Sequence, residues 1–220
     1  MCFSPEADLV GGVVLAAIGV DALWHVRRRR DHTAIAALPL LLALHQLDEA
    51  FVWWGLQGQV ATAVGRAATW IYLAFAFVVL PVYLPASVLA LEPPGRRRAL
   101  MTGFVGLGGL VAAVLAAAMV TGPVTATLGD HHLAYGTGLR AGGLVVVAYV
   151  LATCGAVVFS GYRRLAVFGL VNLVAVTVLA RLAIDGFASL WCAWAAVTAG
   201  FIALHLRRGV VRGSVAEALA

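Results

Sequence analysis

The sequence predicts an all-α integral membrane protein, a bundle of seven transmembrane helices that forms a single domain over residues 1–220. Of the 220 residues, 63% are hydrophobic and 11% are charged, and the mean hydropathy is +0.98. Soluble domains are about 45–50% apolar and about 25% charged. A helix needs roughly 20 apolar residues to cross a hydrocarbon core about 30 Å thick. Apolar runs of that length recur along the whole chain, which is typical of a multi-pass membrane protein.

Short polar breaks separate the apolar runs. The expected spans are residues 8–26, 34–56, 67–87, 100–120, 141–161, 165–184 and 187–206. The first helix has Ser4 as its N-cap and Pro5 at its first position, and Asp8 lies against the positive end of the helix dipole. The last break is so short that the sixth and seventh spans must form a tight hairpin.

Small residues in the fourth span have the spacing of a helix-packing motif. Gly109, Ala113 and Ala117 recur every four residues, a spacing that lets two helix backbones approach closely. We therefore expect this face of the fourth span to contact a neighbouring helix.

The arginines predict the orientation in the membrane. All 15 basic residues are arginine. Twelve of them lie in the breaks after the first, third and fifth spans or after the seventh, and Arg66, Arg140 and Arg181 lie on the other side. Because cytoplasmic loops are enriched in basic residues, we expect the N-terminus outside, the C-terminus in the cytoplasm, and the protein in the cell membrane. Most tryptophans fall near the expected outer interface, which agrees.

The basic residues also exclude several classes of function. Without lysine the chain cannot form a retinal or pyridoxal Schiff base or use a lysine general base. The arginines lie in short groups between apolar runs and do not form a continuous basic surface, which excludes a nucleic-acid-binding protein. We expect no cofactor.

The second span carries polar side chains that are costly within a bilayer. A charged side chain inside a span costs about 2.5–3.5 kcal/mol on insertion scales, so it is a candidate for function. At 100° per residue, one face of this helix carries an imidazole, an amide, a carboxylate and an indole in order. These side chains belong to His45, Gln46, Glu49 and Trp53, whereas Asp48 falls to the side. The helix rise places Glu49 in the outer third of the bilayer.

Three other stretches send polar groups to the same outer layer. They are Asp185 just before the seventh span with Ser189 and Cys192 within it, His132 and Tyr135 in the loop between the fourth and fifth spans, and Cys2 and Ser4 at the N-terminus. The inner half holds mostly arginine and ordinary interfacial groups. This asymmetry predicts one polar pocket near the outer surface.

Several of these motifs resemble a known family. They are Met1-Cys2-Phe3-Ser4, Gln46, Glu49 and Trp53, His132 and Tyr135, and Ser189-Leu190-Trp191-Cys192. Together they look like a bacterial multi-pass membrane family that is catalogued as a domain of unknown function. Pro5 and His45 depart from the commoner pattern of that family. The resemblance implies the fold but no activity.

The layout predicts acid–base chemistry on a lipophilic small molecule. A carboxyl in an apolar, indole-lined site favours its protonated form and donates a proton. In outline, the chain is similar to the membrane-bound terpene cyclases, which implies Glu49 as the acid, Asp185 as a second acid or base, and aromatic rings that stabilise a cation. The expected substrate contacts are His45, Gln46, Trp53, His132, Tyr135, Ser189 and Trp191. The expected partners are the lipophilic molecule and membrane lipid.

The same residues allow other interpretations. Glu49 can instead hold helices together through a hydrogen bond to Gln46 or a pair with Arg181. A non-catalytic receptor or binding protein would use the same pocket. A permease is disfavoured, because there are no recognisable inverted repeats and no acids at the bilayer midplane.

A metal or thiol site is a further alternative. His45, His132 and Glu49, with Cys2 or Cys192, could assemble a zinc site for a membrane hydrolase. The chain lacks the paired-histidine spacing typical of such sites, so we expect no metal. The two cysteines lie on the expected oxidising side, where they could form a structural disulfide, or Cys2 could act as an N-terminal nucleophile.

Overall fold

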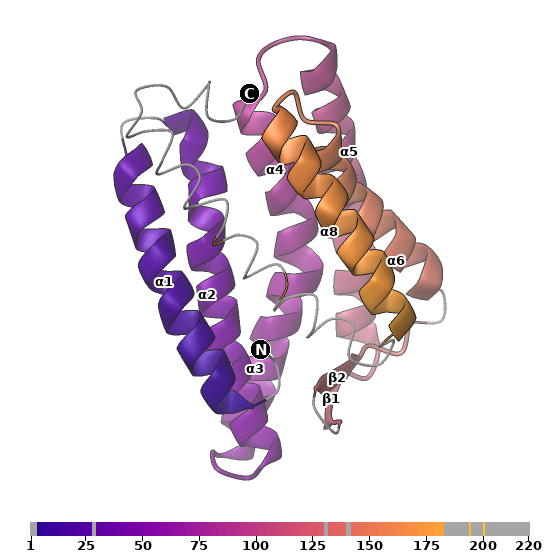
Figure 1. Ribbon diagram of the computed structural model, residues 1–220. Coiled ribbons are helices and arrows are strands. Elements are labelled where there is room, and N and C mark those ends of the chain that lie inside the picture. The colour runs from indigo at the N-terminus through magenta and orange to yellow at the C-terminus, as the bar shows by residue number, and fades with distance from the viewer. Residues whose placement is uncertain are drawn as a thin grey trace.

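The computed structural model describes residues 4–27, 30–129, 132–139 and 142–182, together with Trp194 and Gly200. The described part of the chain is a bundle of helices with one β-hairpin (Figure 1). In order, the elements are α1 (Pro5–Val26), α2 (Arg30–Leu56), α3 (Thr62–Ala74), the π-helix η1 (Phe75–Val79), α4 (Leu80–Leu91), α5 (Arg96–Thr121), β1 (Thr125–Leu128), β2 (Leu133–Gly136), α6 (Gly142–Val150), the π-helix η2 (Leu151–Gly155), α7 (Ala156–Val158) and α8 (Arg163–Leu182).

Within these described residues, four helices are long and apolar enough to cross a membrane. They are Pro5–Val26, Asp31–Leu56, Thr62–Leu91 and Arg96–Thr121, and the apolar helix Gly142–Val158 is shorter. The first four expected spans lie within these four helices. The fifth, residues 141–161, overlaps the shorter apolar helix, and the sixth, residues 165–184, overlaps α8, which is not one of the four candidates. The expected seventh span, residues 187–206, lies outside the described residues. Ser4 caps α1 as predicted, because its hydroxyl accepts a hydrogen bond from the backbone N–H of Ala7 at 3.2 Å.

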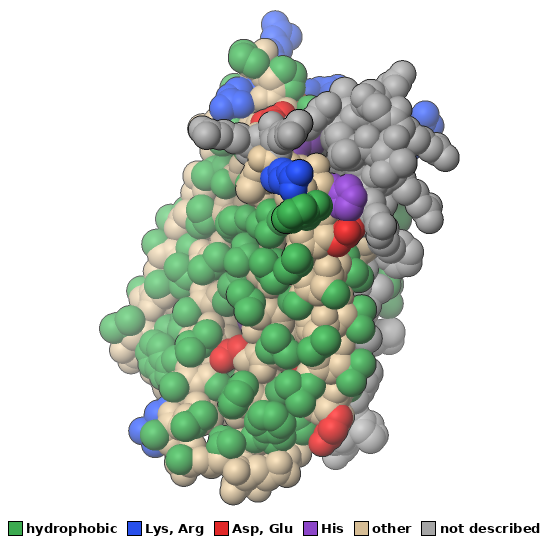
Figure 2. Space-filling view, turned by 90° about the vertical axis from the view of Figure 1, so that its left-hand side faces the viewer, with side chains coloured by type: hydrophobic (Ala, Val, Ile, Leu, Met, Phe, Trp, Pro, Cys, Tyr) green, Lys and Arg blue, Asp and Glu red, His purple; other side chains and the backbone are tan. Residues whose placement is uncertain are grey.

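The surface of the bundle is unusually apolar. On α1 the side chains of Val10 and Trp24 are 64% and 65% exposed, and large hydrophobic residues are also exposed along α5, α6 and α8. Figure 2 shows hydrophobic side chains covering most of one face, with arginines at its two ends. Contiguous apolar surface bounded by charge matches a helix bundle surrounded by lipid.

Glycines bring α1 and α2 into close contact. A Cβ at Gly19 would lie 2.6 Å from the backbone nitrogen of Leu40, and one at Gly12 would lie 2.7 Å from the Leu47 side chain. Small residues at such positions allow close backbone approach. The buried stripe along α1 continues to its first turn, where Asp8 is fully buried.

The packing face of α5 differs from the prediction by one helical position. Ala113 and Ala117 are exposed, and a Cβ at Gly109 would meet nothing within 4 Å. The close contact is made instead by Gly108, which packs directly against the Pro81 carbonyl. The prediction of a Gly109, Ala113 and Ala117 interface is therefore wrong, because small residues occupy both adjacent faces and spacing alone does not choose between them.

The loop expected between the fourth and fifth spans contains an antiparallel hairpin. β1 pairs with β2 in the register Thr125↔Gly136 to Leu128↔Leu133. Leu133 is fully buried and packs with Val52, Trp53 and Tyr72, so the hairpin belongs to the core of the bundle. The hairpin lies toward the same end of the bundle as the turn between α2 and α3 (Figure 1).

Candidate functional site

A buried polar cluster joins the first turn of α1 to the second half of α2. Asp8 and Glu49 are 0% exposed and Gln46 is 1% exposed. The Gln46 side-chain amide donates a hydrogen bond to the Asp8 carboxyl. Glu49 lies one turn further along α2, close enough to Asp8 for their charges to interact. Two carboxyl groups and an amide therefore share one site that side chains screen from water.

The β-hairpin contributes a third element to this cluster. The Tyr135 hydroxyl on β2 donates a hydrogen bond to Glu49 Oε1 at 3.3 Å. This contact spans 86 positions in the sequence and joins the hairpin to α2. The hairpin therefore contacts Glu49 through Tyr135, and Gln46 connects the cluster to α1 through its hydrogen bond to Asp8.

Aromatic rings line the other side of the cluster. Tyr135 stacks on Tyr72 with centroids 4.4 Å apart and an interplanar angle of 15°. Tyr72 stacks in turn on His45 at 4.0 Å and 21°, and His45 contacts Phe75 at 4.6 Å. The stack runs from β2 through α3 to α2, and so it holds the imidazole of His45 in a fixed, buried position.

Some polar atoms of the cluster have no hydrogen-bond partner among the described residues. They are Asp8 Oδ2 and the Trp53 indole nitrogen, together with Asp48 Oδ2 beside the cluster. Trp53 is 5% exposed, and its indole interacts with the Asp8 carboxyl without a direct hydrogen bond. Buried polar atoms of this kind cost about 1–3 kcal/mol each when unsatisfied. Among the described residues, hydrogen-bonding capacity therefore remains next to the carboxyls.

The structure brings together five of the predicted site residues. His45, Gln46, Glu49, Trp53 and Tyr135 all lie in or directly beside the cluster. Their role in binding or catalysis stays a prediction.

The remaining predicted residues are not placed in the cluster. His132 lies at the hairpin turn, where its backbone carbonyl accepts a hydrogen bond from Gly129 and its ring folds back toward Gly129. Asp185, Ser189, Trp191, Cys2 and Cys192 lie outside the described residues.

Sequence reasoning missed Asp8 as a member of the site. We expected it to complement the helix dipole at the interface, but it is fully buried and bound to Gln46. A signal was present, because Asp8 lies on the same face of α1 as Gly12 and Gly19. A carboxyl in line with a small-residue packing stripe must enter the helix interface. Tyr72 was missed as well, because its stacking on His45 and Tyr135 is a tertiary contact that the local sequence does not indicate.

No metal-binding geometry occurs within residues 4–27, 30–129, 132–139 and 142–182: no three His, Cys, Asp or Glu side chains there are grouped to hold an ion. What these residues can do is hold a proton. Carboxyl groups that share a water-poor site favour the neutral form, which is a proton donor.

The chain belongs to a family of unknown function, DUF6629, whose profile matches residues 1–217. This agrees with the resemblance to an uncharacterised family. No curated protein and no solved structure matches the chain.

Proposed function

We propose that this protein is a seven-pass enzyme of the cell membrane that performs acid–base chemistry on a lipophilic small molecule. The observation that carries the proposal is the buried group of Asp8, Gln46 and Glu49, with Tyr135 bonded to Glu49. Ionisable side chains within membrane-spanning helices are costly and mark functional sites by default. Here two of them lie together, beside aromatic rings.

The orientation we propose has the carboxyl cluster near the outer surface. α1 ends and α5 and α8 begin at one end of the bundle, whereas α3 begins at the opposite end (Figure 1). By their positions in the sequence of these helices, Arg27, Arg163 and residues 96–98 belong to the first end and Arg66 to the second. Cytoplasmic segments are enriched in arginine. The arginine-rich end is therefore cytoplasmic, the N-terminus is outside, and the chain crosses the membrane a seventh time at residues 187–206.

In the proposed reaction Glu49 is the proton donor. A neutral Glu49 transfers its proton to an alkene or epoxide of the substrate, which leaves a carboxylate on Glu49 and a cation on the substrate. The cation rearranges or cyclises while the electron-rich faces of nearby aromatic rings such as Tyr72 stabilise it. The substrate then loses a proton to a second carboxylate, and transfer of that proton back to Glu49 completes the cycle, so no external oxidant or reductant is needed.

Two residues are candidates for that second carboxylate. Asp8 is the one that the described residues bring beside Glu49. Asp185 was predicted from the sequence and stays a prediction. The roles of Ser189 and Trp191 in binding the substrate also stay predictions, and the similarity in layout to terpene cyclases supports this chemistry by analogy alone.

A second candidate function is a non-catalytic binding protein. Glu49 is 0% exposed and hydrogen-bonded to Tyr135, and a closed cluster of this kind also occurs where polar groups only hold helices in register. In that case the cluster contributes stability and ligand affinity, and no substrate is converted.

The experiment compares lipid extracts from cells that lack the gene with cells that express wild type, Glu49→Gln or Asp48→Asn. Asp48→Asn is the matched control, because it removes a neighbouring carboxyl on α2 that is outside the hydrogen-bonded cluster. If the proposal holds, a lipophilic product appears with wild type and with Asp48→Asn and is lost with Glu49→Gln at equal protein level. A product pattern that is unchanged by Glu49→Gln contradicts the enzymatic proposal. The binding protein would give no product in any strain.

A further inference from the structure

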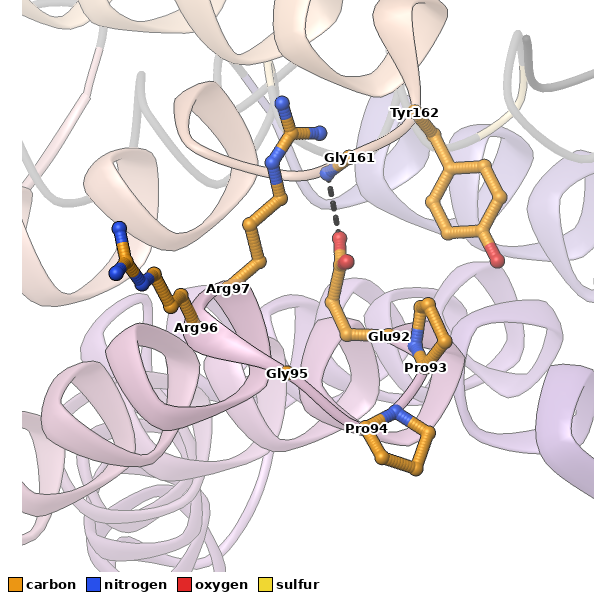
Figure 3. Close-up of a pocket in the computed structure, with 8 residues that line it drawn as sticks. All are labelled: Glu92, Pro93, Pro94, Gly95, Arg96, Arg97, Gly161 and Tyr162. Carbon is orange, nitrogen blue, oxygen red and sulfur yellow. Dashed lines mark hydrogen bonds between the residues drawn. The ribbon is translucent and has the colours of Figure 1, made fainter.

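A second polar feature lies at the opposite end of the bundle from the carboxyl cluster. A cavity of about 390 Å³ opens between the turn that joins α4 to α5 and the turn that joins α7 to α8. Its lining residues are Glu92, Pro93, Pro94, Gly95, Arg96, Arg97, Gly161 and Tyr162 (Figure 3). None of them has a part in the proposed acid–base chemistry.

Glu92 fixes the two turns to each other. It is only 2% exposed, and its Oε1 accepts hydrogen bonds from the Gly161 N–H at 2.5 Å and the Ser160 hydroxyl at 3.1 Å. The second oxygen, Oε2, accepts no hydrogen bond from the described residues. The neutral Tyr162 phenol donates to the Leu91 carbonyl, and burial together with the charges of Glu92 and Asp31 raises the pKa of Tyr162. One buried carboxylate oxygen therefore remains available at the cavity.

Two guanidinium groups at the cavity form no hydrogen bond or ion pair with the described residues. Arg98 donates to the carbonyls of Leu89 and Glu92 at 3.1 and 2.8 Å. Arg96 and Arg97, by contrast, make no hydrogen bond or ion pair with any residue in the described part of the chain. Arg97 extends beside Glu92 to Gly161, where a Cβ would lie 2.9 Å from its Nη1, and Arg96 lies at the side of the cavity (Figure 3).

The charges at this end also oppose local helix stability. The first turn of α5 holds Arg96, Arg97 and Arg98 and no acid, and α8 begins with Arg163 and Arg164. The N-terminus of a helix carries a partial positive charge, so cations there are unfavourable by several tenths of a kcal/mol each at the surface. An anion bound between the two turns would relieve this repulsion.

We propose that the cavity binds the head group of a phospholipid that carries a hydrogen-bond donor beyond its phosphate. The phosphate is held by Arg96 and Arg97, and the ammonium or hydroxyl donor of the head group bonds to Glu92 Oε2. Arginine is well suited to phosphate, because its planar fork forms paired hydrogen bonds. Phosphatidylethanolamine and phosphatidylglycerol both have this chemistry.

The position of the cavity favours a lipid over a soluble phosphate. It lies where one candidate span, Thr62–Leu91, ends and the next, Arg96–Thr121, begins. Basic pockets at the cytoplasmic ends of spans lie at the level of the head groups. The inference therefore rests on the membrane architecture of the proposed function, but not on its chemistry.

The test measures lipid binding to the full-length protein in detergent by native mass spectrometry, with phosphatidylethanolamine, phosphatidylglycerol and phosphatidylcholine of identical acyl chains. Wild type should bind the first two several-fold more strongly than phosphatidylcholine, which has no donor. Arg96→Gln/Arg97→Gln should weaken binding of all three about tenfold or more. Glu92→Gln keeps an acceptor for Gly161 and should abolish only the preference over phosphatidylcholine. Arg66→Gln, at the other end of the bundle, is the control and should change nothing.

Several outcomes overturn the inference. If Arg66→Gln loses as much lipid binding as Arg96→Gln/Arg97→Gln, the lipids bind through non-specific electrostatic attraction and not in the cavity. If Arg96→Gln/Arg97→Gln binds the lipids as strongly as wild type does, the head groups bind elsewhere on the protein. Displacement of the lipid by inorganic phosphate at millimolar concentration assigns the cavity to a soluble anion. If instead alkaline carbonate extracts the protein from membranes, the membrane architecture of the proposed function fails, and this result is distinguishable from a change in lipid preference.

Discussion

Asp8 and Gln46 are hydrogen-bonded to each other across the α1–α2 interface, although 38 positions separate them in the sequence. The contact lies on the stripe where Gly12 and Gly19 let the two helices approach. The close packing of α1 on α2 therefore places an acid of one helix against an amide of the other, and the same approach brings Asp8 beside Glu49.

This pair should show energetic coupling. Gln46→Leu leaves the Asp8 carboxyl buried without its donor, which costs about 1–3 kcal/mol. Asp8→Leu/Gln46→Leu removes both polar groups and should be less destabilised than the sum of its single variants. Thermal unfolding of the four proteins in detergent gives the coupling energy of the double-mutant cycle. Additive effects would mean that the two side chains act independently.

The Tyr135–Glu49 contact predicts separate roles for the hydroxyl and the ring. Tyr135→Phe removes the hydrogen bond to Glu49 and keeps the stacking on Tyr72, so it should lower stability by about 1 kcal/mol. Tyr135→Ala also removes the stacked ring and should cost at least about 3 kcal/mol. Both variants are compared with wild type by thermal unfolding in the same detergent. Equal effects of the two would show that the ring contributes nothing.

The α1–α2 approach can be tested at its closest point. In Gly19→Ala the new methyl group would meet the Leu40 backbone at 2.6–2.8 Å, so the helices must separate at a cost of about 1–3 kcal/mol. Gly103→Ala on α5 is the matched control, because a methyl group there meets nothing within 4 Å, and alanine favours a helix over glycine. A melting temperature lowered by Gly19→Ala and unchanged or raised by Gly103→Ala is expected. A tolerated Gly19→Ala would contradict the close packing.

The helices and the polar face of α2 were predictable because they depend on local pattern. Apolar runs of bilayer length gave the spans, and the 100° helical period gave the face that carries His45, Gln46 and Glu49. The burial of Asp8 was not predicted, because a carboxyl in the first turn of a helix has an adequate local explanation at the dipole. The sequence signal for its burial was the helix face that Asp8 shares with Gly12 and Gly19.

The hairpin and the α5 packing face were missed for related reasons. Thr125–Leu128 and Leu133–Gly136 are each four residues long, too short for alternation to distinguish a strand from a loop. On α5, glycine and alanine occupy adjacent faces, so the choice of Gly108 over Gly109 depends on where Pro81 lies. The hydrogen bond between Tyr135 and Glu49 depends on where the hairpin lies against α2, and no short sequence pattern indicates it.

The proposed orientation predicts which turns can be labelled from outside the cell. In a variant with Cys2 and Cys192 replaced by serine, Gln59→Cys should react with a membrane-impermeant maleimide in intact cells. Arg163→Cys should react only after permeabilisation, because it lies at the arginine-rich end. Both positions are exposed, and Cys154 is buried within the bundle, so the background should be low. Labelling of both from the same side would place the two ends in one compartment, and labelling of Arg163→Cys alone in intact cells would invert the orientation. The first result would contradict a bundle that spans the membrane, and the second would place the carboxyl cluster toward the cytoplasm, against the proposed orientation.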